Sequence, residues 1–168
     1  GSTVDTNMIE FIVYNEFGCT DTTRKTIVVY PQVKANYNID DNNYEGCNSR
    51  EVIFTNTSNY GTHTADLFTW NFGDGETSSS DNVTLNHEYV NDSNIDKVFN
   101  FNLFAESQYG CSHDTSNSIT IFRTEANFTV DNVEGCSPLQ ISVTNTSIGS
   151  GITSWNWDYG DSYSDVIQ

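Results

Sequence analysis

Hydrophobic and polar residues alternate with a period of two along most of this chain. Phe99, Phe101 and Leu103 are separated by asparagines, and Ile119 and Ile121 are separated by a threonine. A period of two places the apolar side chains on one face of a β-strand. No segment combines helical periodicity with the residues that begin and end helices. The pattern therefore predicts an all-β protein.

The alternating segments predict about seven strands between residues 34 and 123. The expected strands are 34–39, 51–57, 67–72, 83–90, 97–106 and 117–122, with a short additional strand near 76–81. About seven short strands separated by turn residues are typical of an immunoglobulin-like sandwich, in which two sheets pack face to face.

The sequence also repeats itself at intervals of about 90 residues, which is longer than a solenoid unit and fits a complete sandwich domain. Glu45-Gly46-Cys47 recurs as Glu134-Gly135-Cys136, and Gly18-Cys19 recurs as Gly110-Cys111. The offsets differ slightly, which indicates that the loops vary in length while the strands are kept. Further matches pair Ala35-Asn36-Tyr37 with Ala126-Asn127-Phe128, 54–58 with 143–147, Trp70 with Trp157, Ile9, Phe11 and Val13 with Phe101, Leu103 and Ala105, and Ile27, Val29 and Tyr30 with Ile119, Ile121 and Phe122.

These matches divide the chain into three parts. Residues 34–123 are expected to form one complete repeat. Residues 1–33 match the last two strands of a preceding repeat, and residues 124–168 match the first three strands of a following one. An isolated hairpin is only marginally stable in water. We therefore expect each partial repeat either to dock on a neighbouring chain or to stay disordered.

The charge balance excludes several classes of partner. The chain has 23 acidic and 6 basic residues and a formal net charge of −17. Nucleic-acid binding needs clustered Lys and Arg, and an anionic membrane surface would repel this chain. No run of about 18 apolar residues is present, so the sequence predicts no membrane insertion. The Asn-, Thr- and Ser-rich composition is typical of an extracellular β protein.

Acidic residues cluster in the first loop of the complete repeat. Asp40 and Asp41 lie close to Glu45 in the sequence, and Asp131 and Glu134 are their counterparts in the third part. Calcium takes several oxygen ligands from loops, although the spacing here is not that of an EF-hand. A solvated acidic surface explains the same charge. Calcium at Asp40, Asp41 and Glu45 is the one cofactor that we consider, and no other is expected.

An aromatic–Gly–Asp motif occurs at residues 70–75 and again at 157–162. We expect its aromatic rings to fill the space between two sheets, its glycine to adopt positive φ, and its aspartate to accept hydrogen bonds from turn amides. A catalytic carboxylate is the alternative, but neither aspartate has a second carboxylate at a fixed spacing. We interpret the motif as structural, and its members are Trp70, Phe72, Gly73, Asp74, Gly75, Trp157, Tyr159, Gly160 and Asp161.

Other residues with catalytic chemistry do not form a recognisable set. His63, His87 and His113 are scattered and match no metal-binding spacing. Cys111 and His113 are close in sequence, but side chains so close together on a β-turn do not easily converge, and no third group is present to orient them. The chain has no P-loop, dinucleotide-binding or G-x-S-x-G motif. The sequence therefore predicts a protein that is not an enzyme.

The four cysteines occupy only two positions of the repeat. Cys47 and Cys136 lie between the first two strands, and Cys19 and Cys111 lie between the last two. None forms a C-x-x-C pair, and disulfides are the usual state of cysteine in a secreted β protein. The two positions belong to opposite ends of a sandwich, roughly 20–30 Å apart, whereas a disulfide needs Cα atoms within about 7 Å. We expect bridges between successive repeats; an intra-repeat Cys47–Cys111 bridge in a distorted loop is the alternative.

Taken together, these motifs resemble a PKD domain. The resemblance rests on Ala-Asn-Tyr/Phe, T-N-T-S, W-N-F-G-D-G, His87-Glu88-Tyr89 and Tyr109-Gly110-Cys111. The copies with paired Gly-Cys motifs resemble the tandem PKD-type repeats of large SprB-like adhesins of gliding Bacteroidetes. The third part departs from the pattern, because Ser162 stands at the motif position that Gly75 occupies in the complete repeat. The implied fold is a series of tandem Ig-like PKD sandwiches.

The resemblance implies a non-catalytic stalk on the outer-membrane exterior of a bacterium. It implies export by the type IX system and contact with the substratum during gliding motility, with neighbouring repeats as partners. The short linker 30–33 contains a proline, which favours a semi-rigid junction.

The alternative is an accessory module of a secreted hydrolase, because PKD domains also accompany such enzymes. In that case outward aromatic residues such as Phe104 and Phe122 would contact a polysaccharide or protein ligand.

Overall fold

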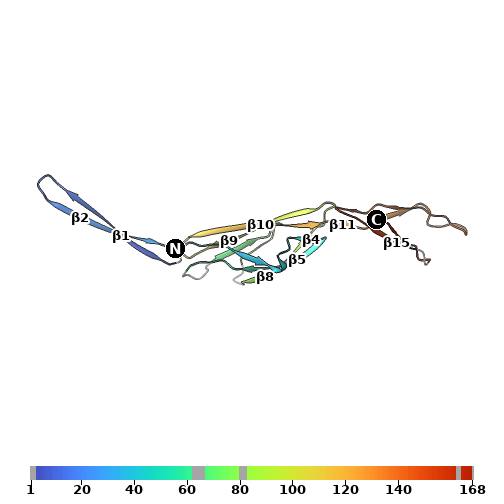
Figure 1. Cartoon of the computed structure of the whole chain (residues 1–168), viewed down its shortest axis with the longest axis horizontal. Helices are drawn as coiled ribbons and strands as arrows, with labels where there is room; N and C mark the ends of the chain where they lie inside the picture. Colours follow the sequence, from blue (N-terminus) through green and yellow to red (C-terminus); the bar gives the residue numbers. More distant parts are fainter. Residues whose placement is uncertain (1–2, 62–66, 80–82, 162–163, 168) are drawn as a thin grey trace. The chain divides into compact units, whose positions relative to one another are not determined.

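The computed structural model describes residues 3–61, 67–79, 83–161 and 164–167, and almost all of its regular structure is β (Figure 1). One 3₁₀ turn covers Asp40–Asn42. The strands are β1 (Asp5–Tyr14), β2 (Thr20–Val29), β3 (Tyr37–Ile39), β4 (Glu45–Cys47), β5 (Ser49–Asn56), β6 (Leu67–Asn71), β7 (Thr77–Ser78), β8 (Thr84–Val90), β9 (Lys97–Glu106), β10 (Ser112–Phe122), β11 (Thr124–Glu125), β12 (Phe128–Val130), β13 (Val143–Asn145), β14 (Ile148–Gly149), β15 (Trp155–Asp158) and β16 (Ser164–Ile167).

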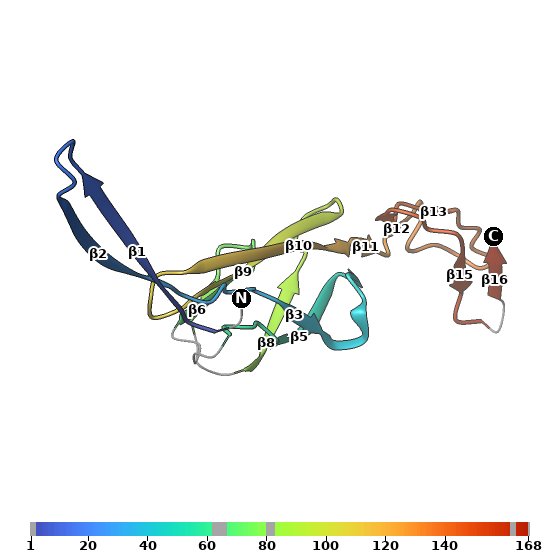
Figure 2. The same cartoon turned by 60° about the vertical axis from the view of Figure 1, so that its left-hand side comes forward.

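Eight strands form a β-sandwich, which confirms the predicted fold class. One layer contains β3, β5 and β8, and the other contains β7, β6, β9 and β10. The short strand β4 connects the layers, because it meets β5 only at the Cys47–Ser49 pair and then runs parallel to the end of β10. Figure 2 shows β10 alongside β9, its neighbour in the same layer. Gly46 of β4 makes this approach close, since an added Cβ would lie 3.1 Å from the Ile121 side chain of β10.

By its contacts the chain divides into two compact units. Residues 1–42, 53–85 and 100–117 form the first unit, and residues 43–52, 86–99 and 118–168 form the second. Each has its own apolar core, described separately below.

An aromatic cluster around Trp70 forms the core of the first unit. Trp70 is fully buried, and its ring lies 5.0 Å from that of Phe54 and 5.7 Å from that of Tyr37. Phe101 of β9 completes the cluster, 5.1 Å from Phe54 and 5.4 Å from Tyr37. These four rings come from β6, β5, β3 and β9, so the cluster holds strands of both layers together. Such edge-to-face and tilted pairs contribute roughly 0.5–1.5 kcal/mol each beyond the burial of their area.

The core of the second unit is built around Tyr89 of β8. Its ring lies 5.0 Å from that of Phe99 on β9, and His87 packs edge-on against it at 4.7 Å. Ile119 and Ile121 on β10 are buried in the same unit. Alternate residues of β8, β9 and β10 therefore point inward, as the period of two predicted.

Asn91 anchors the second unit through polar contacts. It is 1% exposed, and its Nδ2 donates to the carbonyl oxygens of Ile121 at 2.7 Å and Ile95 at 2.8 Å. Its Oδ1 accepts from the Ser93 amide at 3.0 Å. A buried amide that satisfies both its donors and its acceptor fixes the loop after β8 on β10.

Several predicted strand boundaries were wrong. The strand expected at 34–39 is shorter, because Lys34 forms only an isolated bridge with Asn59 before β3 begins. β10 begins at Ser112 instead of residue 117, and its first half carries polar residues on both faces. β4 was not predicted, because three residues with a glycine and a cysteine carry no alternation.

The two ends of the chain form separate two-stranded sheets. β1 and β2 pair along their whole length, from Asp5 with Val29 to Tyr14 with Thr20. The segment after residue 123 contains the pairs β11–β14, β12–β13 and β15–β16. The three strands expected there are therefore six short strands in the described residues.

The hairpin β1–β2 reproduces the hairpin β9–β10 at a constant offset. In the first turn the Gly18 amide donates to the Asn15 carbonyl at 3.1 Å; in the second the Gly110 amide donates to the Ser107 carbonyl at 2.9 Å. Gly18 and Gly110 have φ of 79° and 75°, a region that favours glycine. The repeat found in the sequence is thus also a repeat of backbone conformation.

We predict that Trp70→Ala strongly destabilises the sandwich, by about 3–5 kcal/mol, because it removes the ring at the centre of the aromatic cluster. Trp157→Ala is the matched control, since Trp157 occupies the same motif position outside the sandwich and is only partly buried. Urea unfolding followed by the near-ultraviolet circular dichroism of the buried rings measures both. Equal losses for the two variants would contradict the role assigned to Trp70.

Candidate functional sites at the aromatic motif and the ends of the sandwich

The aromatic–Gly–Asp motif of residues 70–75 forms the end of β6 and the turn into β7. Its aromatic residues Trp70 and Phe72 are buried. The Gly73 amide donates to Asn71 Oδ1 at 2.9 Å, and the Glu76 amide donates to Asp74 Oδ1 at 2.9 Å. One carboxylate oxygen of Asp74 therefore accepts a bond within its own turn, which is how aspartate commonly stabilises turns.

Gly73 is required by both its conformation and its surroundings. Its φ is 79°, and an added Cβ would lie 2.1 Å from the Asn100 carbonyl oxygen on β9. Gly75 also has positive φ, 104°, but an added Cβ there would meet nothing within 4 Å. The first glycine thus lets β9 pass beside the turn, and the second serves only the backbone conformation.

The second copy of the motif keeps the local geometry without the burial. The Gly160 amide donates to Asp158 Oδ1 at 2.9 Å, and Gly160 has φ of 77°. Tyr159 is 40% exposed, whereas its counterpart Phe72 is 3% exposed. An added Cβ at Gly160 would meet nothing within 4 Å. Asp161 is exposed, and Ser162 lies outside the described residues.

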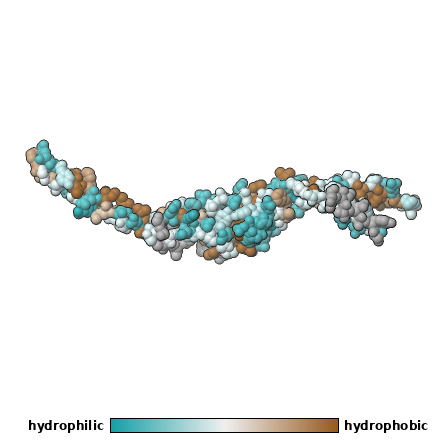
Figure 3. Space-filling model, viewed as in Figure 1, coloured by the Kyte–Doolittle hydropathy of each residue, from teal (hydrophilic) through white to brown (hydrophobic). Residues whose placement is uncertain are grey.

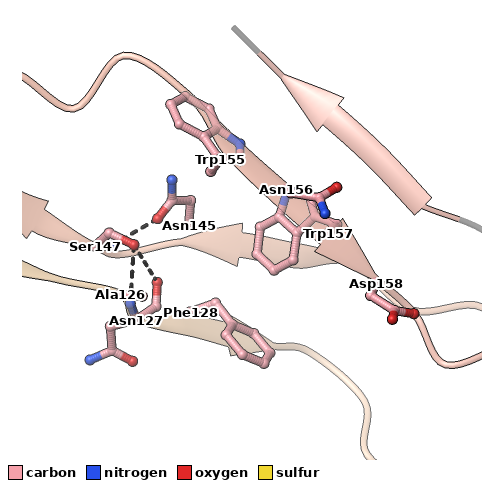
Figure 4. Close-up of a pocket in the computed structure, with 9 residues that line it drawn as sticks. All are labelled: Ala126, Asn127, Phe128, Asn145, Ser147, Trp155, Asn156, Trp157 and Asp158. Carbon is pink, nitrogen blue, oxygen red and sulfur yellow. Dashed lines mark hydrogen bonds between the residues drawn. The ribbon is translucent and has the colours of Figure 1, made fainter.

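Beside this second motif lies a pocket of about 290 Å³ between β12, β13 and β15 (Figure 4). The rings of Phe128 and Trp157 form one wall, edge-on at 5.4 Å. On the other side of the pocket, Ser147 Oγ accepts a hydrogen bond from the Asn127 amide at 3.0 Å and donates one to the Asn127 carbonyl oxygen at 3.2 Å.

The complete sandwich makes the same contacts and has this space filled. Ser58 Oγ accepts from the Asn36 amide at 3.0 Å and donates to its carbonyl at 3.3 Å. Tyr37 corresponds to Phe128, and Phe101 of β9 packs against its ring. The pocket therefore corresponds to the space that β9 fills in the sandwich.

The described histidines have structural partners. His113 Nδ1 accepts from the Ala35 amide at 3.2 Å, which ties the start of the sandwich to β10. His87 is buried against Tyr89. His63 lies outside the described residues.

Carboxylates of the acidic first loop and of its counterpart accept hydrogen bonds from backbone amides. Asp40 Oδ1 accepts from the Ile53 amide at 3.1 Å, and Asp131 Oδ1 accepts from the Ser142 amide at 2.7 Å in the third part. The hydrogen bond from the Ser142 amide is the main cause that lowers the pKa of Asp131. In the part of the chain that the structure describes, no three His, Cys, Asp or Glu form a group that could hold a metal ion, so calcium at Asp40, Asp41 and Glu45 stays a prediction.

All four cysteines are free thiols in this structure. Cys47 pairs with Phe122, the last residue of β10, and Cys111 directly precedes Ser112, the first residue of β10. The bridges between successive repeats and the alternative Cys47–Cys111 bridge within one repeat both stay predictions.

An aromatic stack lies at the end where the chain enters the sandwich. The rings of Tyr30 and Tyr109 are parallel, with centroids 3.7 Å apart. Tyr109 is in the β9–β10 turn, two residues before Cys111. Val33 is buried beside this junction. The linker 30–33 is therefore packed against the turn.

Hydrogen bonds hold the chain where it leaves the sandwich. The Arg123 amide donates to Asp96 Oδ1 and the Thr124 amide donates to Asn48 Oδ1, both at 2.9 Å. The pKa of Asp96 is lowered, chiefly by a hydrogen bond from the Ser150 side chain and then by the Arg123 amide. Asn48 and Asp96 were not singled out in the sequence, because a single polar loop residue carries no pattern.

Comparisons with known proteins give similarities of structure only. No protein-family model matches the sequence, and a search of curated proteins finds no match. Among the described residues, no helix has the length and apolar character needed to cross a membrane.

Three solved structures are similar to part of this chain. The PKD1 domain of Vibrio anguillarum Epp has 16% sequence identity and a TM-score of 0.43, over 55% of this chain and 96% of that one. The PKD1 domain of the Vibrio cholerae metalloprotease PrtV has 18% identity and a TM-score of 0.42, over 54% and 98%. A structure of carbohydrate-binding modules of the β-sandwich superfamily has 17% identity and a TM-score of 0.48, over 68% and 53%. At these values, what those proteins bind or cleave does not transfer to this chain.

We predict that Asp96→Ala loosens the exit from the sandwich. Amide hydrogen exchange at Arg123 and Thr124 is expected to become faster, because the amide of Arg123 loses its acceptor. Asp92→Ala is the control, since Asp92 is exposed and makes only a 3.8 Å ion pair with Lys97. An equal acceleration in both variants would show that Asp96 has no special role.

The same contact predicts a pH dependence. The pKa of Asp96 is lowered from 3.8 in the folded protein. The ionised carboxylate therefore contributes to the stability of the folded protein at pH values above 3.8, and this contribution is lost as the pH falls through the lower pKa of the folded state. Carboxyl NMR titration of Asp96 measures this directly. A midpoint at or above 3.8 would contradict the hydrogen bonds assigned to it.

Proposed function

We propose that this chain is a non-catalytic section of a long cell-surface adhesin, where it acts as an extended stalk. In this proposal residues 34–123 are one complete PKD-like repeat, and residues 1–33 and 124–168 belong to the repeats before and after it. Module, linker and module then follow one another in a tandem array.

The observation that carries the proposal is the recurrence of the same hydrogen bonds along the chain. The Asn36–Ser58 pair recurs as Asn127–Ser147, and the turn at Gly18 recurs at Gly110. An active site is rarely copied in every repeat, whereas structural contacts must be copied for each module to fold. Repetition of scaffold contacts therefore supports a mechanical role over a catalytic one.

The packing of the linkers supports a stiff stalk. The residues before the sandwich are held by the Tyr30–Tyr109 stack, and those after it by Asp96 and Asn48. A short junction with packed side chains resists bending more than a flexible linker of similar length. The net charge of −17 keeps a crowded surface fibre soluble and mutually repelling.

The resemblance to SprB-like adhesins supplies the finer part of the proposal. In this proposal the protein lies on the outer-membrane exterior of a gliding bacterium, is exported by the type IX system and contacts the substratum. Disulfides between successive repeats belong to the same proposal, as cross-links of the stalk.

Antibody fragments raised against residues 34–123 test the proposal on cells that produce the protein. We predict that they label intact cells along surface fibres and reduce attachment to glass and gliding. Fragments pre-adsorbed with the purified chain are the control. Labelling only after the cells are permeabilised, or labelling of a soluble secreted enzyme, would contradict the stalk.

A binding assay with immobilised polysaccharides distinguishes the stalk from the alternative, an accessory module of a secreted hydrolase. Binding that is lost in Phe104→Ala would favour that alternative.

A further inference from the structure

The hairpin β1–β2 exposes an apolar face that its counterpart in the sandwich buries. Ile9, Phe11 and Val13 are 53%, 62% and 45% exposed. The counterparts on β9 are Phe101, Leu103 and Ala105, all at most 1% exposed. Ile27 and Val29 on β2 are exposed in the same way, whereas Ile119 and Ile121 on β10 are buried. Apolar residues follow the length of the hairpin (Figure 3).

The third part of the chain has the complementary surface. In the sandwich, β6 pairs with β7 on one side and with β9 on the other. β15 pairs with β16 in the register of β6 with β7, so that Trp157 faces residue 165 as Trp70 faces Ser78. The side of β15 that corresponds to the β9 side of β6 lies at the pocket that has the rings of Phe128 and Trp157 as one wall.

We propose that the hairpin β1–β2 of one copy of this chain docks on residues 124–158 of a second copy and completes a sandwich there. The first copy supplies the last two strands, and the second copy supplies the earlier ones. The proposal does not depend on the stalk function.

The sandwich of residues 34–123 gives the register of this contact. Trp70 faces Leu103, and Phe68 faces Ala105. Each of these residues has a counterpart in the partial repeats. When the counterparts replace them, Trp157 of the second copy faces Phe11, and Trp155 of the second copy faces Val13. Ile9 takes the place of Phe101 and fills the pocket beside Phe128 of the second copy.

The parallel β4–β10 contact has a counterpart too. Ile121 faces Gly46, and Phe122 faces Cys47. In the assembled pair, Val29 and Tyr30 of the hairpin therefore run beside Gly135 and Cys136 of the second copy. Residues 134–136 form no strand in this structure, and the docked hairpin would give them one to pair with.

A second copy is the occupant that we propose, because both surfaces belong to this chain and their registers match. The linker 30–33 is held against the β9–β10 turn by the Tyr30–Tyr109 stack. A hairpin that docks on another copy leaves this junction unchanged.

This head-to-tail contact brings cysteines of the two copies together. Tyr30 stacks on Tyr109, two residues before Cys111. Cys136 of the second copy, paired with Tyr30, therefore lies beside Cys111 of the first. The sandwich of the second copy and the assembled sandwich meet at a second junction of the same kind. There Cys47 of the second copy takes the place of Cys136, and Cys19 of the first copy takes the place of Cys111, so these two cysteines also lie side by side.

Each pair can form a disulfide when an oxidant such as glutathione disulfide is present. Two thiols lose two protons and two electrons, a bond forms between their Sγ atoms, and one glutathione disulfide is reduced to two glutathione molecules. The contact is heterologous and does not close on itself, so it generates linear chains of copies.

The test is the association of the purified 168-residue chain under reducing conditions, followed by sedimentation velocity over a range of concentrations. We expect a series of oligomers that grows with concentration. Phe11→Asp should weaken this association at least about a hundredfold in Kd, because it places a charge in the buried contact. Met8→Asp is the matched control, since Met8 lies on the opposite face of β1 and corresponds to the exposed Asn100.

Mixing two variants that cannot associate on their own tests which segment of each copy makes the contact. Phe11→Asp keeps a normal acceptor segment, and Trp157→Asp keeps a normal hairpin. Each variant alone should stay monomeric, and the equimolar mixture should give only a 1:1 dimer. A monomeric wild-type chain, oligomers that Phe11→Asp and Met8→Asp change equally, or a monomer whose β1–β2 amides are fully protected would overturn the proposal.

Oxidation of the wild-type chain with glutathione disulfide identifies the register. Peptide mapping should find Cys19–Cys47 and Cys111–Cys136 between copies, and both should disappear in Phe11→Asp. Bridges between identical cysteines would contradict the head-to-tail arrangement. None of these results bears on whether the protein lies on a cell surface, so the stalk proposal and this one can fail separately.

Discussion

Closing an aromatic interior between two β-layers is the constraint on which the rest of this structure depends. Trp70 is buried only because Phe54, Tyr37 and Phe101 approach it from strands of both layers. Hydrophobic burial of this kind is the main favourable term in folding, and neither layer can obtain it alone. The Gly73 turn, with no side chain to obstruct β9, is the local feature that lets the layers close. The aromatic–Gly–Asp motif is therefore best understood as the part of each repeat that allows closure.

The same constraint explains the two ends of the chain. The β1–β2 hairpin and the segment around Trp157 have the backbone conformations of a sandwich without its opposite layer, and their apolar residues are accordingly exposed. Each lacks what the other supplies. We have proposed that a neighbouring repeat closes each end in a tandem array, and that a second copy closes it when separate chains associate. The Tyr30–Tyr109 stack is the packed junction on which both proposals draw.

Much of this architecture is readable in the sequence, because alternation and repetition are periodic signals. The strand around Phe101 was predicted with its observed bounds, the strand around Ile121 was predicted without its first five residues, and the inward position of Trp70 was predicted correctly. Two features without a periodic signal were not predicted. One is β4, which is a strand only because it pairs with β10, and the other is Asn91, whose burial depends on where β8 ends. The partners of the four cysteines stay predictions, because the expected ones belong to another repeat.

Amide hydrogen exchange measured over a range of concentrations tests whether the hairpin of another copy completes the open interior. We expect the amides of 9–13 and 155–158 to become protected together as concentration rises, while those around Trp70 stay protected throughout. Protection of the two end segments that does not change with concentration would contradict it.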